Sequence, residues 1–117
     1  MDGASIGRAA IGAAASVFGV GSDEVIRPKS VPSRLARGAA ISTAFDLHQE
    51  QAMTWSDVEV SMRAGGFNLC QSSLRKHRQV LGELVNAGGG FAEALRGLCD
   101  RTLATARLRC LGPSFAA

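Results

Sequence analysis

The feature that most restricts the fold of this chain is its wealth of alanine between glycine and proline breaks. Most segments between these breaks run for a dozen residues or more, and none holds a run of β-branched residues typical of a strand. Alanine favours helix more than any other residue, whereas glycine and proline end helices. The sequence therefore predicts an all-α fold. With 117 residues, the chain is long enough for one compact domain and too short for two ordinary ones.

Apolar residues at helical spacing predict about five helices. The first covers residues 6–20, a short turn of helix follows at 22–24, and a longer helix covers 32–51. The next two helices are expected near 55–64 and 71–86. A last amphipathic helix is expected to bury Phe91, Leu95, Leu98, Thr102 and Ala106, before a frayed tail from Leu108 onward that contains Pro113.

The two helices within residues 54–86 have the form of a DNA-binding helix-turn-helix. Thr54 and Asp57 are spaced as a capping box at the start of the first helix, and Gly65-Gly66 ends it. The second helix carries apolar residues on one side. Its other side carries the polar residues Ser72, Arg75, Lys76 and Gln79. At 100° per residue, these four positions fall within about one third of the helix circumference, as on the recognition helix of a helix-turn-helix.

The distribution of charge supports this interpretation more than the net charge of +3 does. Residues 27–45 contain four basic residues and no acid, and residues 68–82 contain three basic residues and no acid. Arg and Lys in such stretches suit phosphate contacts, but they also occur on the solvated face of an ordinary helical bundle. Composition and periodicity alone leave both interpretations open.

The order of the parts adds a more specific observation. Ala14-Ala15-Ser16-Val17-Phe18-Gly19-Val20 is followed by Asp23-Glu24-Val25, by the basic linker Arg27-Pro28-Lys29-Ser30 and by the alanine-rich stretch 34–44. Thr54-Trp55-Ser56-Asp57-Val58, Gly66-Phe67 and Gln71-Ser72-Ser73-Leu74-Arg75-Lys76 come next. In this order, residues 11–84 resemble the C-terminal DNA-binding domain of the bacterial replication initiator DnaA.

The resemblance implies roles for individual residues. Gln71, Ser72 and Ser73 would contact bases in the major groove, and Arg27 or Lys29 would enter the minor groove. The arginine-aspartate-histidine signature of the family is replaced by Asn68, Leu69, Cys70 and Gln71. The implied sequence preference therefore differs from that for the replication-origin box.

The function expected is sequence-preferring binding of double-stranded DNA in transcription control, as in a phage-like or gene-transfer-agent activator. The predicted DNA-binding residues are Arg27, Lys29, Arg34, Arg37, Gln71, Ser72, Ser73, Arg75, Lys76 and Gln79. Two alternatives stay open. One is a replication or plasmid-maintenance factor that also binds DNA, and the other is a helical protein-interaction module that does not.

The chain divides into a DnaA-like helix-turn-helix domain at 1–87 and an additional C-terminal helix with a flexible tail at 88–117. That helix is expected either to pack on the domain or to bind RNA polymerase or another regulator. The end at Ala117 has no evident stop signal, so the chain is also considered as one domain of a longer protein.

The sequence favours no enzymatic chemistry, cofactor or metal. It has no GxxxxGK[ST] phosphate loop, and Cys70, Cys99 and Cys110 are too widely spaced for a metal site with His48 or His77. The three cysteines indicate a reducing cytosol, where they would be small buried hydrophobes or free thiols. The apolar stretch 6–20 contains Arg8 and is too short for a membrane span. We expect a cytoplasmic, nucleoid-associated protein.

Overall fold

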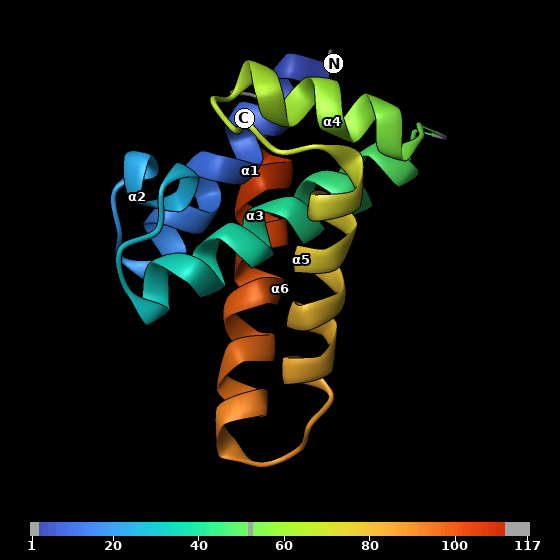
Figure 1. Cartoon of the computed structure of the whole chain (residues 1–117). Helices are drawn as coiled ribbons and strands as arrows, with labels where there is room; N and C mark the ends of the chain where they lie inside the picture. Colours follow the sequence, from blue (N-terminus) through green and yellow to red (C-terminus); the bar gives the residue numbers. More distant parts are fainter. Residues whose placement is uncertain (1–2, 52, 112–117) are drawn as a thin grey trace.

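The helices predicted from the sequence are present in the structure. The computed structural model describes residues 3–51 and 53–111, and all regular secondary structure within them is α-helical (Figure 1). Six helices occur in these residues: α1 (Gly3–Phe18), α2 (Ser22–Ile26), α3 (Val31–Gln49), α4 (Trp55–Ala64), α5 (Gln71–Val85) and α6 (Gly90–Leu111). The all-α prediction is confirmed, and the short α2 accounts for the sixth helix.

Local sequence signals set the start of α3 and the end of α1. At the start of α3, the Ser30 hydroxyl accepts a hydrogen bond from the Ser33 N–H at 3.2 Å, and the Ser33 hydroxyl accepts one from the Ser30 N–H at 2.9 Å. Gly19 follows α1 with a φ of 69°, a left-handed conformation that suits glycine. Helix α1 therefore ends two residues before the predicted limit at residue 20.

The core is built around α1, which packs against α3, α4 and α6. Ile6, Ile41 and Met62 are fully buried there among many alanines. The alanines that blur the apolar face of α3 in the sequence all lie inside the protein, at Ala36, Ala39, Ala40 and Ala44. Their small side chains let the helices approach closely, and this is how a chain with few aromatic residues fills its core.

Helix α6 packs on the rest of the chain. It runs alongside α5 as an antiparallel partner and continues to α1 (Figure 1). Because Ala106 and Cys110 pack into the core around α1, the helix extends to Leu111. The predicted fraying from Leu108 is therefore wrong for residues 108–111, and Pro113 lies outside the described residues.

The packed face of α6 also differs from the prediction at its first turn. Phe91 is 59% exposed, whereas its neighbour Ala92 is buried. The buried positions are 92, 95, 102 and 106, with Cys99 partly buried between them. These positions are separated by alternating steps of three and four residues, which keep them on one face of a helix. Phe91 lies outside this stripe, at the tip of the α5–α6 hairpin.

Candidate nucleic-acid interface

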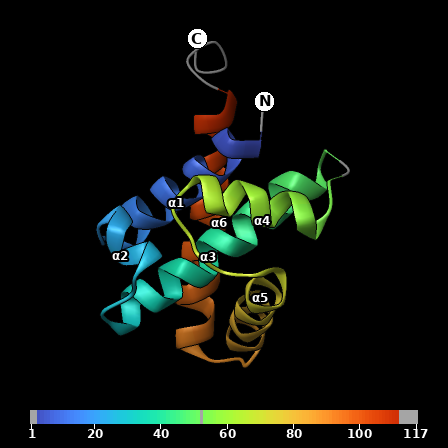
Figure 2. The ribbon, with the colours of Figure 1, turned by 45° about the horizontal axis from the view of Figure 1, so that its top comes forward.

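Helices α4 and α5 are joined by a tight turn that needs a glycine. Gly66 has a φ of 113°, which a residue with a side chain rarely adopts. The next residue, Phe67, is buried and donates its N–H to the Met62 carbonyl at 3.0 Å. The predicted limits of the two helices, 55–64 and 71–86, agree with the structure to within one residue. Figure 2 shows α5 nearly end-on after this turn.

The start of α4 has the cap that its sequence predicts. The Asp57 carboxylate accepts hydrogen bonds from the Thr54 N–H at 2.7 Å and the Thr54 hydroxyl at 3.1 Å. These bonds, above all the one from the backbone N–H, lower the pKa of Asp57. The first helix of the pair is thus fixed at its N-terminus by the residues singled out from spacing.

The polar face predicted for α5 is on the surface. Ser72, Arg75, Lys76 and Gln79 are exposed, and Gln71 and Ser73 are half-buried. On the opposite side, Leu74 and Leu81 are buried against the rest of the protein. The helix therefore presents its hydroxyl, amide and cationic side chains outward while its leucines anchor it.

Several of these side chains already have partners within the protein. The Gln71 side-chain amide donates to the Ser56 hydroxyl at 3.1 Å, and its carbonyl oxygen accepts from Arg75 at 3.0 Å. The Gln79 amide donates to Glu83 at 3.4 Å. The Gln71 contacts hold the start of α5 against α4. Gln71 must therefore exchange these bonds before it contacts a base.

Trp55 supports the exposed face, a role that sequence reasoning missed. Trp55 packs against the core and stacks on Phe45 with ring centroids 4.4 Å apart. The Arg75 guanidinium of α5 lies over the Trp55 ring, 5.6 Å from its centroid. The spacing between Trp55 and Arg75 in the sequence gives no sign of this contact.

Arg78 has a different role from Arg75 and Lys76, although it is close to them in sequence. Its guanidinium lies 4.1 Å from the Phe45 ring centroid and forms an ion pair with Asp46 at 3.3 Å. Both partners are on α3. Arg78 therefore joins α5 to α3.

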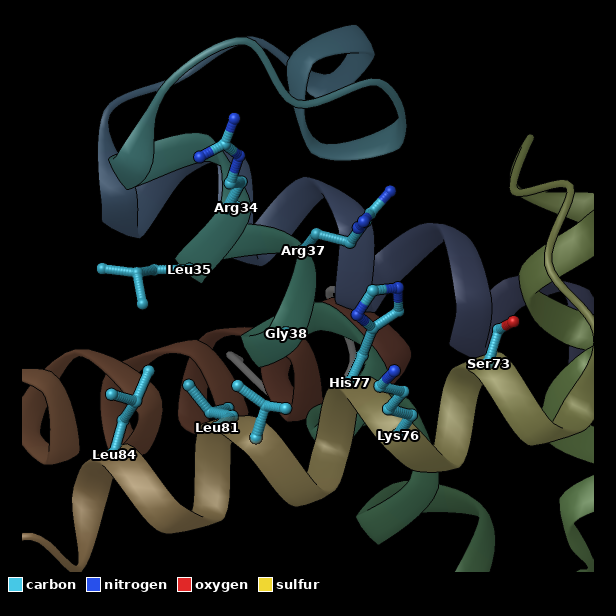
Figure 3. A pocket seen from close by; sticks show the side chains of 10 residues that line it. Arg34, Leu35, Arg37, Gly38, Ser73, Lys76, His77, Leu81 and Leu84 are labelled. Carbon is cyan, nitrogen blue, oxygen red and sulfur yellow. The ribbon is translucent and has the colours of Figure 1, made fainter.

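The four basic residues of the acid-free segment 27–45 fall into two groups in the structure. Arg27 and Lys29 are exposed between α2 and α3, and Arg34 and Arg37 lie in the first turns of α3. Arg34 and Arg37 meet Ser73 and Lys76 of α5 around one groove with a volume of about 530 Å³ (Figure 3). Four of the ten predicted residues thus line a shared site, and Arg27 and Lys29 do not.

The groove is electropositive. No acidic residue lines it, and the ion pairs found among the described residues lie elsewhere, at Arg63–Glu59, Arg78–Asp46 and Arg107–Glu50. Burial lowers the pKa of Arg37, and the nearby Arg34 lowers it further. Burial also lowers the pKa of His77, with added effects of Arg37 and Lys76. The cations of the groove thus lie close enough to disfavour one another's charge, in addition to the larger effect of burial, and an anion placed among them would be stabilised.

Cys70 is the second feature that the sequence did not reveal. It precedes α5 as its N-cap residue and is an exposed free thiol, the second of the two expectations for the cysteines. Its sulfur lies 3.2 Å from the Ser72 hydroxyl and 3.5 Å from the Ser73 hydroxyl. These hydrogen bonds, that of Ser72 foremost, lower the pKa of Cys70 to about 7. The signal in the sequence is a cysteine followed closely by two serines at a helix start.

The remaining candidate chemistry does not assemble. Within residues 3–51 and 53–111, no three His, Cys, Asp or Glu side chains lie close enough to hold a metal ion. No helix in the same residues is long and apolar enough to cross a membrane.

No protein-family model matches the chain, and no curated protein or solved structure is significantly similar to it.

Proposed function

We propose that this chain binds double-stranded DNA with α5 in the major groove and acts as a transcription regulator at the nucleoid. The observation that carries the proposal is the convergence of two acid-free segments, residues 71–82 of α5 and the first turns of α3, next to the helix-turn-helix turn. An α-helix with its side chains is 10–12 Å wide, and the major groove is about 12 Å wide. The likeness of residues 11–84 to the DnaA DNA-binding domain supports the same proposal.

The exposed side chains of α5 suit base edges and phosphates differently. Arg75 offers a planar fork that matches a guanine edge or a phosphate, and Gln71 has the donor and acceptor pair that matches adenine. Ser72 lies in the first turn of α5, where free backbone N–H groups favour a phosphate. Arg34 and Lys76 supply charge on either side of the groove, for the DNA backbone.

Charge reversal on α5 tests this proposal. We expect the Arg75→Glu/Lys76→Glu double variant to bind a fluorescent duplex pool about 100-fold more weakly than the unaltered protein, in anisotropy measurements at about 50 mM salt. The matched control is Arg8→Glu/Arg101→Glu, which makes the same change in net charge at exposed arginines on α1 and α6 and should shift affinity by about fourfold or less.

Circular dichroism of each variant shows whether the helices are retained. Equal losses in the α5 double variant and in Arg8→Glu/Arg101→Glu would mean that only net charge matters, and would contradict a DNA site on α5. Absence of binding by the unaltered protein at low salt would overturn the proposal altogether. In that case the polar face would belong to a protein-interaction module.

A further inference from the structure

The groove between α3 and α5 is more apolar than phosphate contacts require. Besides its cationic residues, it is lined by Leu35, Val80, Leu81 and Leu84, and by Gly38. Val80 is 46% exposed there. Phosphates need donors and positive charge, and they gain nothing from leucine side chains. The apolar part of the groove is therefore left unexplained by the proposed function.

The polar and apolar residues that α5 contributes to the groove are separated along the helix. Ser73, Lys76 and His77 line it in the first half of α5, and Leu81 and Leu84 line it in the second half (Figure 3). On the facing helix, Arg37 lies near the polar end and Leu35 near the apolar end, with Arg34 between them (Figure 3). This order matches a molecule with an anionic head and an apolar chain.

The size of the groove limits that molecule. Its volume of about 530 Å³ falls within the range of small-ligand sites, roughly 300–1,000 Å³. Lys76 and Leu84 are eight residues apart on α5, which corresponds to about 12 Å along a helix. An extended chain advances about 3.5 Å per three bonds, so about ten bonds cover that distance.

We propose that this groove binds a soluble medium-chain carboxylate of about eight to ten carbons. The carboxylate accepts hydrogen bonds from Lys76 and from the Arg37 guanidinium, and the hydrocarbon chain lies on Leu81 and Leu84. The ligand supplies the negative charge that the lining residues lack. No described residue forms an ion pair with Arg37 or Lys76, so neither cation has to leave a partner.

The position of the carboxylate links this site to DNA. Lys76 and Ser73 line the groove and also belong to the predicted DNA-binding face. A carboxylate bound to Lys76 removes a charge that the DNA backbone would otherwise use. The ligand is therefore an inhibitor of DNA binding, and this last step rests on the proposed function.

Direct binding is measured without DNA, by following backbone amide signals in NMR during titration with octanoate below its critical micelle concentration. We expect saturable shifts in α5 and in the first turns of α3. Acetate, which has the head alone, and 1-octanol, which has the chain alone, should bind at least about tenfold more weakly. A fully buried methylene contributes about 0.8 kcal/mol, which is about fourfold in affinity. Because the groove is open on one side, we expect about half of this free energy, so each methylene from hexanoate to decanoate should tighten binding about twofold.

A matched pair of variants locates the chain. Leu84→Gln should weaken octanoate binding about fourfold or more, because an amide replaces an apolar contact. Val60→Gln makes the same kind of change at an exposed valine on α4 and should leave octanoate binding unaltered. Acetate shifting the same amides with equal affinity would overturn the proposal, as would dependence of those shifts on protein concentration alone, which would assign the groove to a second copy.

Competition with DNA separates the two proposals. Octanoate should release a bound fluorescent duplex at the concentrations that saturate the NMR shifts, and should do so less effectively with Leu84→Gln. Octanoate binding by a protein that does not bind DNA would uphold the ligand site and refute the DNA proposal. DNA binding with no octanoate shifts would refute the ligand site and leave the groove to phosphates.

Discussion

Replacing Gly7 with alanine tests how α1 holds the first helix of the helix-turn-helix in place. A methyl group added at Gly7 would lie 2.6 Å from the Ser61 hydroxyl oxygen and closer still to the Ser61 backbone oxygen. Ordinary contacts begin near 3.4 Å, and a backbone oxygen cannot rotate away. Helices α1 and α4 must therefore move apart, at a cost of about 3 kcal/mol, the upper part of the range for overpacking.

Alanine also favours helix over glycine by about 1 kcal/mol, so the net loss is about 2 kcal/mol. Unfolding entropy of about 2.1 cal/mol/K per residue converts this loss into a fall of about 8 °C in the Tm of the 117-residue chain. The assay is thermal unfolding followed by helical circular dichroism. Gly97→Ala is the matched control because a methyl group there meets no atom within 4 Å. It should raise the Tm by about 4 °C. A Gly7→Ala protein as stable as Gly97→Ala would refute the close packing of α1 on α4.

Three further predictions concern single side chains. Arg75→Ala should weaken DNA binding by about 1 to 3 kcal/mol and relax base preference, whereas Lys29→Ala should weaken binding to all duplexes alike. Anisotropy with duplexes of different sequence distinguishes the two effects. Equal sequence preferences in the two variants would contradict the assignment of Arg75 to a base contact. Alkylation of Cys70 should reach half its maximal rate near pH 7, and that of Cys99, whose pKa burial raises, only near pH 11, as followed by mass spectrometry. The His77 ring should titrate in NMR below its ordinary pKa of 6.5, because burial and neighbouring cations disfavour its charged form. As the pH falls below 6.5, the unfolded chain therefore binds this proton before the folded protein does, and the stability of the fold decreases. A His77 midpoint at or above that value would contradict the burial of the ring.

The parts of the fold that follow local rules could be predicted from the sequence. Thr54 and Asp57, three residues apart, cap the start of α4, and Gly66 adopts the positive φ that the turn after α4 requires. Such signals depend on a few neighbouring residues, so the helix limits near the turn were predicted to within one residue. The periodicity of Leu74 and Leu81 likewise fixed which face of α5 is buried.

The parts that depend on contacts between distant residues could not be predicted. Arg75 and Arg78 look alike in the sequence, but only Arg78 meets Asp46, which lies 32 residues away. The groove forms because the start of α3 packs beside α5, and no local pattern shows that packing. Phe91 was expected to be buried but is exposed, because apolar spacing alone does not reveal which face of α6 packs against its neighbours.

The salt dependence of DNA affinity tests the central claim most directly. If α5 and the start of α3 contact about five phosphates, log K falls with log salt concentration at a slope of about −4 to −5, because each contact releases condensed counterions. The measurement uses the unaltered protein and a fluorescent duplex pool over several salt concentrations. A slope in that range, reduced by about one in Lys76→Ala, is the result we predict. A slope near zero, or no binding at the lowest salt concentration, would contradict the account.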